Sequence, residues 1–433
     1  MTSAFNQLAL PLTLTLLLHA TSLAADWPQW RGPGRDGLWN ETGIVENLAA
    51  PTLEPRWTAP IGAGYSGPTV AAGRVYVMDR LTQPSEVERI HCLDWETGRS
   101  LWTRSYECRY RIEFPSGPRT SVTIVDGHGY ALGAIGHLVG LHAESGNVLW
   151  SRDLSNEYEL ALPRWGLAAS PLVCGDVVIV MIGGADGACV VGFDRRSGTE
   201  KWRALDDPAS YASPILVRQA GRDVVICWTG AHVAGLDPET GRIYWKQPYH
   251  PSRMVINIAT PVVHGDSLFL TDFFAGSFMF RMRQEALDVE SLWHRSGKNE
   301  HKTDALHSLM CTPQLRDGHI YGVDSYGQLR CLDATTGNRI WEDTTAVPEA
   351  RWANVHMVRN GERTWLFNEL GELIVARMSS QGYQELGRSK LIEPSGDRVG
   401  EREAVCWSHP AFAYRHVFAR NDGTLVCASL EAK

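Results

Sequence analysis

Lysine is scarce in this chain of 433 residues: six lysines stand beside 35 arginines, and 49 acidic residues outnumber the 41 basic ones. A net charge of −8, with no local basic run, excludes the usual electrostatic surface of a nucleic-acid-binding protein. Charged residues make up 21% and apolar residues 44%, which excludes global disorder. After residue 25 no apolar run reaches the roughly 20 residues that a transmembrane helix needs.

Adjacent cysteines and Cys-x-x-Cys pairs are also missing, although the chain has nine cysteines. A dense disulfide framework would need more cysteines in a shorter chain. Cys92, Cys331 and Cys427 lie at similar places in apolar strands, so we expect them to be small buried residues. One disulfide elsewhere stays open, and the odd number leaves at least one thiol free.

The first 25 residues have the pattern of a secretory signal peptide. Residues 8–18 are apolar but too short to span a bilayer, and the small residues Ser22, Ala24 and Ala25 follow. We expect cleavage near Ala24 or Ala25, although no lysine or arginine precedes the apolar run. No cysteine follows this run, which excludes lipid attachment to a mature N-terminal cysteine. The alternative is an unprocessed disordered N-terminus.

An internal repeat organises the rest of the chain. Five segments align without gaps and end in tryptophan; they are residues 92–102, 140–150, 192–202, 235–245 and 331–341. A degenerate copy and an earlier terminal tryptophan extend the series to Trp57, Trp102, Trp150, Trp202, Trp245, Trp293 and Trp341. The spacings are 43 to 52 residues, and an eighth slot falls at Leu386. Such a period indicates one repeated supersecondary unit.

Each unit reads as four antiparallel strands. Its apolar runs are short and β-branched, and they alternate with Asn-Gly, Asp-Gly or Gly-Asp turns and with the Asp-x-x-Thr-Gly box. No unit has the 3.6-residue period of a helical repeat. The sequence therefore predicts an all-β, eight-bladed β-propeller over residues 53–433, preceded by a segment of residues 26–52; seven blades are the alternative.

The last unit supplies the prediction for ring closure. It stops at Lys433 after three strands, and residues 53–60 can add the missing outer strand. Pairing of the N- and C-terminal strands would remove the exposed edges of an open ring. The terminal tryptophans would then lie on the outer strands, where we expect them to pack between blades with the indole N–H on a backbone carbonyl. A row of aromatic ligand contacts is less consistent with such positions.

The Asp-x-x-Thr-Gly-x-x-x-Trp box resembles the tryptophan-docking motif of the pyrroloquinoline quinone (PQQ) propeller repeat. The resemblance covers about residues 53–433, and residues 26–37 are similar to the opening of exported PQQ-like propellers of no established activity. The family includes quinoprotein alcohol dehydrogenases and the non-catalytic outer-membrane assembly scaffold of the BamB type. The motif therefore identifies the blade and leaves the function open.

The resemblance to quinoprotein dehydrogenases implies PQQ held by a disulfide between adjacent cysteines, above a tryptophan, with Ca²⁺ bound by Glu and Asn beside an Asp base. This chain has no adjacent cysteines, and it is shorter than those enzymes. Asp94, Asp194, Asp237 and Asp333 are explained as turn formers. We therefore expect no cofactor, and PQQ with calcium is the less favoured alternative.

Histidines offer only a weak metal hypothesis. No His-x-His or His-Glu-x-x-His pair occurs, but a propeller can bring ligands from different blades into its channel. The candidates are His307, His356 and His409. No Ser-His-Asp set or phosphate-binding glycine loop stands out.

The segments that lead into the innermost strands are the best candidates for a site. They carry bulky polar and aromatic residues where a turn alone needs none, and we expect their tips to face the central channel. The predicted ligand-binding residues are Arg119, Arg164, Trp165, Tyr211, Asn257, Trp407 and His409. The alternative is that these side chains only fill the channel mouth.

We therefore expect a soluble, exported, periplasmic or extracellular propeller that binds a protein, peptide or glycan partner at its channel face. The working expectation is a monomer with no transmembrane segment and no nucleic-acid partner. The alternative is an enzyme acting on a sugar or an alcohol, either as a quinone-dependent dehydrogenase or as a metal-assisted hydrolase or lyase. Catalytic residues are not identified by the sequence.

Overall fold

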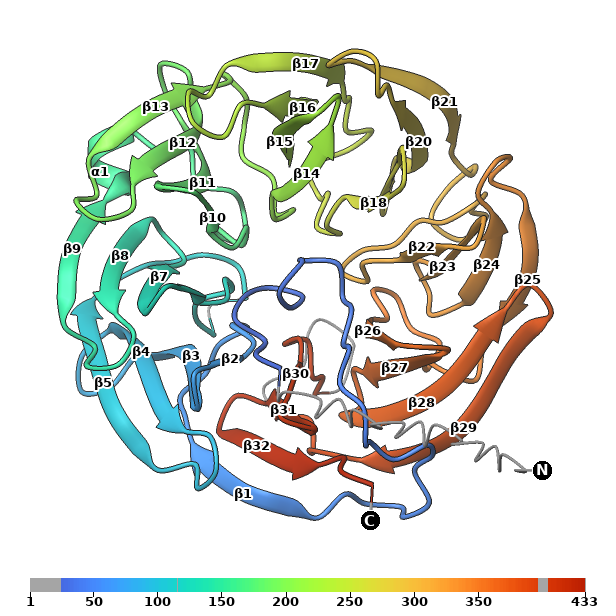
Figure 1. The fold of residues 1–433 in the computed structure, drawn as a ribbon, viewed down its shortest axis with the longest axis horizontal. Coiled ribbons are helices and arrows are strands. Elements are labelled where there is room, and N and C mark those ends of the chain that lie inside the picture. Colours follow the sequence, from blue (N-terminus) through green and yellow to red (C-terminus); the bar gives the residue numbers. More distant parts are fainter. Residues whose placement is uncertain (1–24, 115, 396–403, 433) are drawn as a thin grey trace, which may run out of the picture.

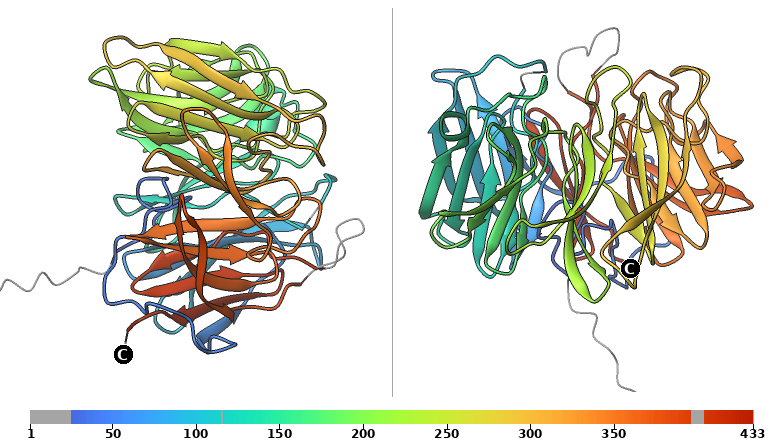
Figure 2. Two further views of the ribbon diagram at one scale, coloured as in Figure 1. Left: turned by 90° about the vertical axis from the view of Figure 1, so that its right-hand side faces the viewer. Right: turned by 90° about the horizontal axis from the view of Figure 1, so that it is seen from above.

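The predicted four-stranded units form a closed ring around a central axis (Figure 1). The computed structural model describes residues 25–114, 116–395 and 404–432; residues 1–24 of the predicted signal peptide lie outside them. Eight antiparallel four-stranded sheets follow one another in chain order, with the first strand of each unit innermost and the last at the circumference. The side views in Figure 2 show the ring as a thick disc.

The first four blades contain β2 to β17 and one short helix. Blade one has β2 (Thr69–Ala71), β3 (Arg74–Leu81), β4 (Val87–Asp94) and β5 (Ser100–Glu107). Blade two has β6 (Thr123–Val125), β7 (His128–Leu132), β8 (His137–His142) and β9 (Val148–Asp153), followed by α1 (Leu154–Tyr158). Blade three has β10 (Leu172–Cys174), β11 (Val177–Gly184), β12 (Ala188–Asp194) and β13 (Glu200–Ala204). Blade four has β14 (Ile215–Gln219), β15 (Arg222–Trp228), β16 (His232–Leu236) and β17 (Ile243–Pro248).

The remaining blades contain β18 to β32 and β1. Blade five has β18 (Val262–His264), β19 (Ser267–Asp272), β20 (Gly276–Met282) and β21 (Val289–Arg295). Blade six has β22 (Gln314–Arg316), β23 (His319–Val323), β24 (Leu329–Asp333) and β25 (Arg339–Asp343). Blade seven has β26 (Val355–Asn360), β27 (Arg363–Asn368), β28 (Glu372–Ser379) and β29 (Gly382–Lys390). Blade eight has β30 (Ala411–Ala413), β31 (His416–Arg420), β32 (Thr424–Ser429) and β1 (Pro55–Pro60).

The ring closes as the sequence predicts. β1 pairs antiparallel with β32, from Pro55 opposite Ala428 to Pro60 opposite Thr424. The N-terminal strand is therefore the outer strand of the last blade, and the two ends of the propeller are held together by backbone hydrogen bonds. All nine cysteines are buried and free.

The periodic tryptophans pack between neighbouring blades. Trp150 illustrates the arrangement: its Nε1 donates to the Arg195 carbonyl in the β12–β13 turn of the next blade, at 3.0 Å. A Cβ on Gly198 in that turn would lie 2.6 Å from the Trp150 ring, and Gly198 has φ of +70°. The same turn is closed by Asp194, which accepts from the Ser197 N–H at 2.9 Å. Glycine is therefore required by the turn and by the docked indole together.

Blade five lacks the Asp-x-x-Thr-Gly box, and a glutamine side chain accepts the indole hydrogen bond in place of a turn carbonyl. Trp245 Nε1 donates to Gln219 Oε1 at 2.9 Å instead of to a backbone carbonyl of the next blade. Gln219 Nε2 in turn donates to the carbonyls of Arg283 and Asp288, in the β20–β21 connection of blade five. The glutamine side chain thus relays the blade contact that a turn carbonyl makes elsewhere.

The eighth slot differs from the expectation by one residue. Gly387, not Leu386, lies in the tryptophan register, because Val375 pairs with Gly387 and the strand bulges at Leu386. A Cβ on Gly387 would lie 2.2 Å from the Leu48 carbonyl oxygen. The backbone of the N-terminal segment therefore occupies the place that an indole fills in the other blades.

The N-terminal segment, residues 26–52, crosses the middle of the ring (Figure 1). Trp27 pairs with Val70 of β2, and Thr52 pairs with Lys390 of β29. Trp27 and Trp39 are both 1% exposed and pack in a core shared with blades one, seven and eight. The segment is therefore part of the hydrophobic core, and it passes across one end of the channel.

Candidate functional site

A cavity of about 450 Å³ lies at the mouth of the central channel; we call it the channel-mouth cavity. Each of the eight connections that lead from an outer strand to the next innermost strand contributes at least one lining residue. From blade one onwards, representative residues are Tyr65, Arg119, Trp165, Tyr211, Ile256, Met310, Trp352 and Trp407. The cavity is thus formed by the whole ring and belongs to no single blade.

The N-terminal segment forms the floor of the cavity. Trp30 lines it, donates from Nε1 to Thr260 Oγ1 at 2.8 Å, and packs edge-on against His409 with ring centroids 4.5 Å apart. Arg35 is 3% exposed, and its guanidinium donates to the carbonyls of Ser170, Pro171 and Pro214. Burial lowers the pKa of Arg35 to about 9, so the group stays charged at neutral pH. One arginine therefore ties the segment to blades three and four.

Six of the seven predicted ligand-binding residues line the cavity. They are Arg119, Arg164, Trp165, Tyr211, Trp407 and His409. Asn257 does not: it is fully buried, and its Nδ2 donates to the carbonyls of Trp228 and Thr229. Ile256 and Ile258 face the cavity instead, because successive side chains of extended backbone point to opposite sides. Asn257 therefore supports the wall from behind.

Among the described residues, one side of the cavity rim carries Arg119, Arg164 and a single carboxylate, Glu113. Arg164 pairs with Glu113 at 2.6 Å, and this guanidinium holds the pKa of Glu113 below its usual range. Arg119 has no carboxylate within ion-pair distance among the described residues; it donates to the carbonyls of Glu113, Phe114 and Gly117, and burial lowers its pKa. A charged group held by neutral acceptors in a cavity favours an anionic ligand.

A second pair of arginines shares one carboxylate. Arg351, which lines the cavity, lies 2.7 Å from Glu300, and Arg253 lies 3.7 Å from the same residue. Arg253 also covers the Phe274 ring at 4.8 Å. Among the described residues, Arg351 and Arg253 therefore meet at Glu300 on this side of the rim.

The apolar half of the cavity was not predicted. Trp352 and Phe274 line it, and Met254, Met310 and Leu309 extend the same surface. Trp352 lies three residues before β26, as Trp407 lies four before β30. Trp352 could have been predicted, because it lies on a segment that leads into an innermost strand, as Trp407 does. The methionines and Phe274 could not, because such residues carry no sequence signal that separates a cavity wall from a core.

The three candidate metal ligands do not form a metal site. His307 is held by the Phe273 carbonyl and the Gly297 N–H, away from the other two histidines. His356 and His409 both line the cavity, but their ring centroids are 6.1 Å apart, and His356 Nε2 lies 2.9 Å from the Trp407 carbonyl. Across residues 25–114, 116–395 and 404–432 no three His, Cys, Asp or Glu side chains are grouped to hold a metal.

Burial keeps both cavity histidines neutral. Burial lowers the pKa of His409 to about 3 and that of His356 to about 4, from 6.5. His409 Nε2 lies 2.6 Å from Ser121 Oγ, a neutral partner. Imidazoles with such pKa values are weak bases at neutral pH, so neither is suited to general-base catalysis.

These pKa values predict an acid-sensitive fold. Below pH 6.5 the unfolded chain binds protons that the folded chain excludes, so stability is full above about pH 6.5 and falls toward the folded pKa values. From pH 7 to 5 His409 should cost about 2 kcal/mol of unfolding free energy. Urea unfolding of His409→Gln should show a pH dependence smaller by that amount. The exposed His250→Gln is the control; an equal dependence in both variants would contradict the prediction.

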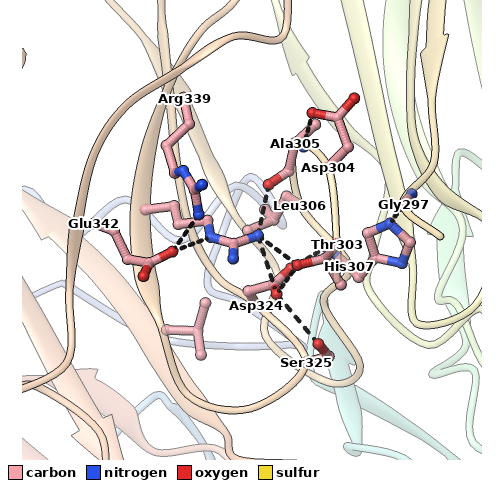
Figure 3. A network of polar contacts seen from close by, with 12 residues as sticks. Gly297, Thr303, Asp304, Ala305, Leu306, His307, Asp324, Ser325, Arg339 and Glu342 are labelled. Atoms are coloured by element: carbon pink, nitrogen blue, oxygen red, sulfur yellow. Dashed lines mark hydrogen bonds and ion pairs between the residues drawn. The ribbon is translucent and has the colours of Figure 1, made fainter. Parts of the chain in front are cut away.

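A buried polar network holds the connection between blades five and six (Figure 3). Asp324, 2% exposed, accepts from Thr303 Oγ1 at 2.6 Å, from the His307 N–H at 2.6 Å and from Arg330 Nη1 at 3.0 Å. Arg330 also pairs with Glu342 at 2.8 Å. This network fixes the segment that carries Leu309 and Met310 to the cavity wall.

The cavity does not fit PQQ with calcium. Glu113 is the one carboxylate among the lining residues, and it is paired with Arg164. No Asp or Asn lines the cavity, whereas Ca²⁺ takes six to eight oxygen ligands from such groups. The donor set for the metal is therefore not present in the described part of the channel mouth.

The fold and the cavity define an eight-bladed propeller of the PQQ-repeat class. A family model described as outer membrane protein assembly factor BamB matches residues 41–157 and 86–343, more than half of the chain. The chain belongs to this family. The only helix in the described residues has five residues, so none of them could cross a membrane as a helix.

One relative in sequence and two solved structures are similar to this chain. Outer membrane protein assembly factor BamB of Burkholderia pseudomallei (strain K96243) is 24% identical over 405 residues, which cover 89% of this chain and 82% of that protein. The crystal structure of BamB from Moraxella catarrhalis matches 87% of this chain and 100% of that chain, with a TM-score of 0.60 and 16% identity. The structure of a europium-containing methanol dehydrogenase matches 91% of this chain and 89% of that chain, with a TM-score of 0.64 and 13% identity. At these identities the two structures establish the fold alone.

Proposed function

We propose that this chain is a non-catalytic binding module, exported to the periplasm or the cell exterior, that holds a segment of a partner protein in the channel-mouth cavity. The observation that carries the proposal is the lining itself: Trp165, Trp352 and Trp407 with methionines, under a rim of arginines. Large apolar anchors in a concave site are typical binding hot spots. Membership in the BamB family, whose name describes an assembly factor, supports a protein partner.

The chemistry of the lining favours one kind of segment. Met254, Ile256 and Met310 offer no hydrogen bonds to the hydroxyls of a glycan, but they suit bulky apolar side chains. Arg119 suits a carboxylate beside such a side chain. The expected ligand is therefore a peptide segment that presents aromatic or aliphatic side chains next to Asp, Glu or a C-terminal carboxylate.

The proposal is tested by quantitative capture from an envelope extract with matched variants. A true partner should be retained by the wild type and by Leu149→Ala, which changes an exposed leucine of outer strand β9. It should be reduced about 30-fold by Trp407→Ala, because a hot-spot truncation costs about 2 kcal/mol.

Synthetic peptides from the captured protein then give the specificity. Binding can be followed by the fluorescence of Trp30, Trp165, Trp352 and Trp407, which line the cavity. Peptides with Asp and Glu replaced by Asn and Gln should bind the wild type more weakly. This loss of affinity should be smaller for the Arg119→Gln variant. Equal capture by Trp407→Ala and wild type would refute the channel mouth as the binding site.

A further inference from the structure

The first described residue contacts a buried carboxylate. Glu41 is 2% exposed, and its Oε1 accepts from the Ala25 backbone nitrogen at 2.9 Å. Its Oε2 accepts from Trp39 Nε1 at 2.7 Å and from the Arg415 backbone N–H at 2.8 Å. All three donors are neutral groups as long as residue 25 is joined to residue 24 by a peptide bond.

Glu41 has no cationic partner in the described part of the chain. Arg56, Arg415 and His416 line a neighbouring cavity with it, but none of them lies within ion-pair distance of its carboxylate. Arg415 pairs with Glu431 at 2.7 Å instead. A buried carboxylate is costly without a counter-charge, so the site has room for one positive group at the position of the Ala25 nitrogen.

The sequence supplies that charge by proteolysis. Ser22 and Ala24 are the small residues that a signal peptidase requires at the third and first positions before its cut. Hydrolysis of the Ala24–Ala25 bond adds one water, leaves a carboxylate on Ala24 and creates an α-ammonium on Ala25. We propose that the leader is removed between Ala24 and Ala25 and that the new α-ammonium binds Glu41 as its ion-pair partner.

The residues directly after Ala25 are fixed to the ring by hydrogen bonds. Only one cleavage position therefore places an α-ammonium beside Glu41. Asp26 accepts from Tyr414 Oη at 2.5 Å, and the Trp27 N–H donates to the Val70 carbonyl at 2.7 Å. A cut after Ala25 would remove the nitrogen that contacts Glu41. Cleavage at Ala24 therefore fastens the start of the segment that places Trp30 and Arg35 in the channel.

The cleavage position is tested on the exported protein. This inference depends on the export proposed above, and the outcomes separate the two. Intact-mass and N-terminal peptide mass spectrometry of the secreted chain should give Ala25 as the first residue. A first residue of Asp26 or beyond would overturn the inference while leaving export intact, whereas a retained leader would overturn both.

The ion pair is tested by a two-by-two comparison in the exported chain. Insertion of Gly-Ser between Ala24 and Ala25 moves the ammonium away, and Glu41→Gln removes the carboxylate charge. The insertion should lower Tm by about 3–5 °C with Glu41 present and by about 1 °C or less with Gln at 41. Equal shifts in both backgrounds would overturn the pairing.

Amine reactivity gives a readout that a merely structural role of Glu41 would not change. An amine-reactive ester at pH 7 should label the Ala25 nitrogen about tenfold more slowly in the wild type than in Glu41→Gln, because the ion pair favours the protonated amine by about one pKa unit. Peptide mass spectrometry measures the two rates. Equal rates would overturn the inference.

Discussion

Replacement of Arg35 by methionine is expected to lower the free energy of unfolding by about 3–5 kcal/mol, although Arg35 lies outside every blade. Its guanidinium donates to three buried carbonyls at the starts of β10 and β14, those of Ser170, Pro171 and Pro214. Methionine can fill much of the volume but donates no hydrogen bond. The Ser170 and Pro214 carbonyls would then lose this donor away from solvent, whereas the Pro171 carbonyl would keep the hydroxyl of Thr123 as a donor at 2.7 Å.

Urea unfolding of the wild type and the variant, followed by circular dichroism, measures this loss. Arg99→Met is the control, because Arg99 is exposed in the β4–β5 turn and has no side-chain hydrogen bond among the described contacts. Its effect should stay within about 0.5 kcal/mol. A loss for Arg35→Met no larger than that of the control would show that the contacts of Arg35 with the ring do not contribute to stability.

The ring could be predicted because its determinants are local and repeated. Asp94 accepts from the N–H and hydroxyl of Thr97, which closes a turn that the Asp-x-x-Thr-Gly pattern already specifies. The position of Trp102 follows from the same pattern, since it lies a fixed number of residues after the turn. Ring closure followed from counting strands, and β1 supplies the missing one.

The site was predicted only where position in the repeat determines the direction of a side chain. Trp165 and Trp407 lie on segments that must reach the channel, and both line the cavity. Asn257 lies on such a segment too, but neighbouring side chains of this segment point to opposite sides, and the sequence does not show which of them face the cavity. The side chain of Asn257 points away from the cavity, to the Thr229 carbonyl. The same one-residue ambiguity moved the eighth slot from Leu386 to Gly387.

The floor of the cavity could not be predicted, because it depends on contacts between residues far apart in the chain. Trp30 meets Thr260, 230 residues away, and Arg35 meets Pro214, 179 residues away. The composition of the N-terminal segment does not show whether it packs inside the ring or only connects other parts of the chain. In the sequence, residues 26–37 show only a family resemblance, whereas in the structure Trp30 of this segment lines the cavity.

Truncation of Trp202 to alanine is expected to cost about 3–5 kcal/mol of unfolding free energy, because it empties the space between blades three and four. Trp202 is 6% exposed, and its Nε1 donates to the Pro238 carbonyl at 3.2 Å. Gly241 leaves room for the ring: a Cβ there would lie 2.5 Å from it. Chemical denaturation of the purified variant measures the loss, and Leu149→Ala at the exposed circumference is the control.

Comparison with Trp245 separates packing from the hydrogen bond. Trp202→Phe leaves the Pro238 carbonyl without its donor, and Trp245→Phe leaves Gln219 Oε1 without its donor. Each should cost about 1–3 kcal/mol. Gln219→Leu should cost less in the Trp245→Phe background than in the wild type, because the Gln219 Oε1 atom has already lost its indole donor there. If Gln219→Leu instead costs the same in both backgrounds, the glutamine acts through the carbonyls of Arg283 and Asp288 and not through the indole.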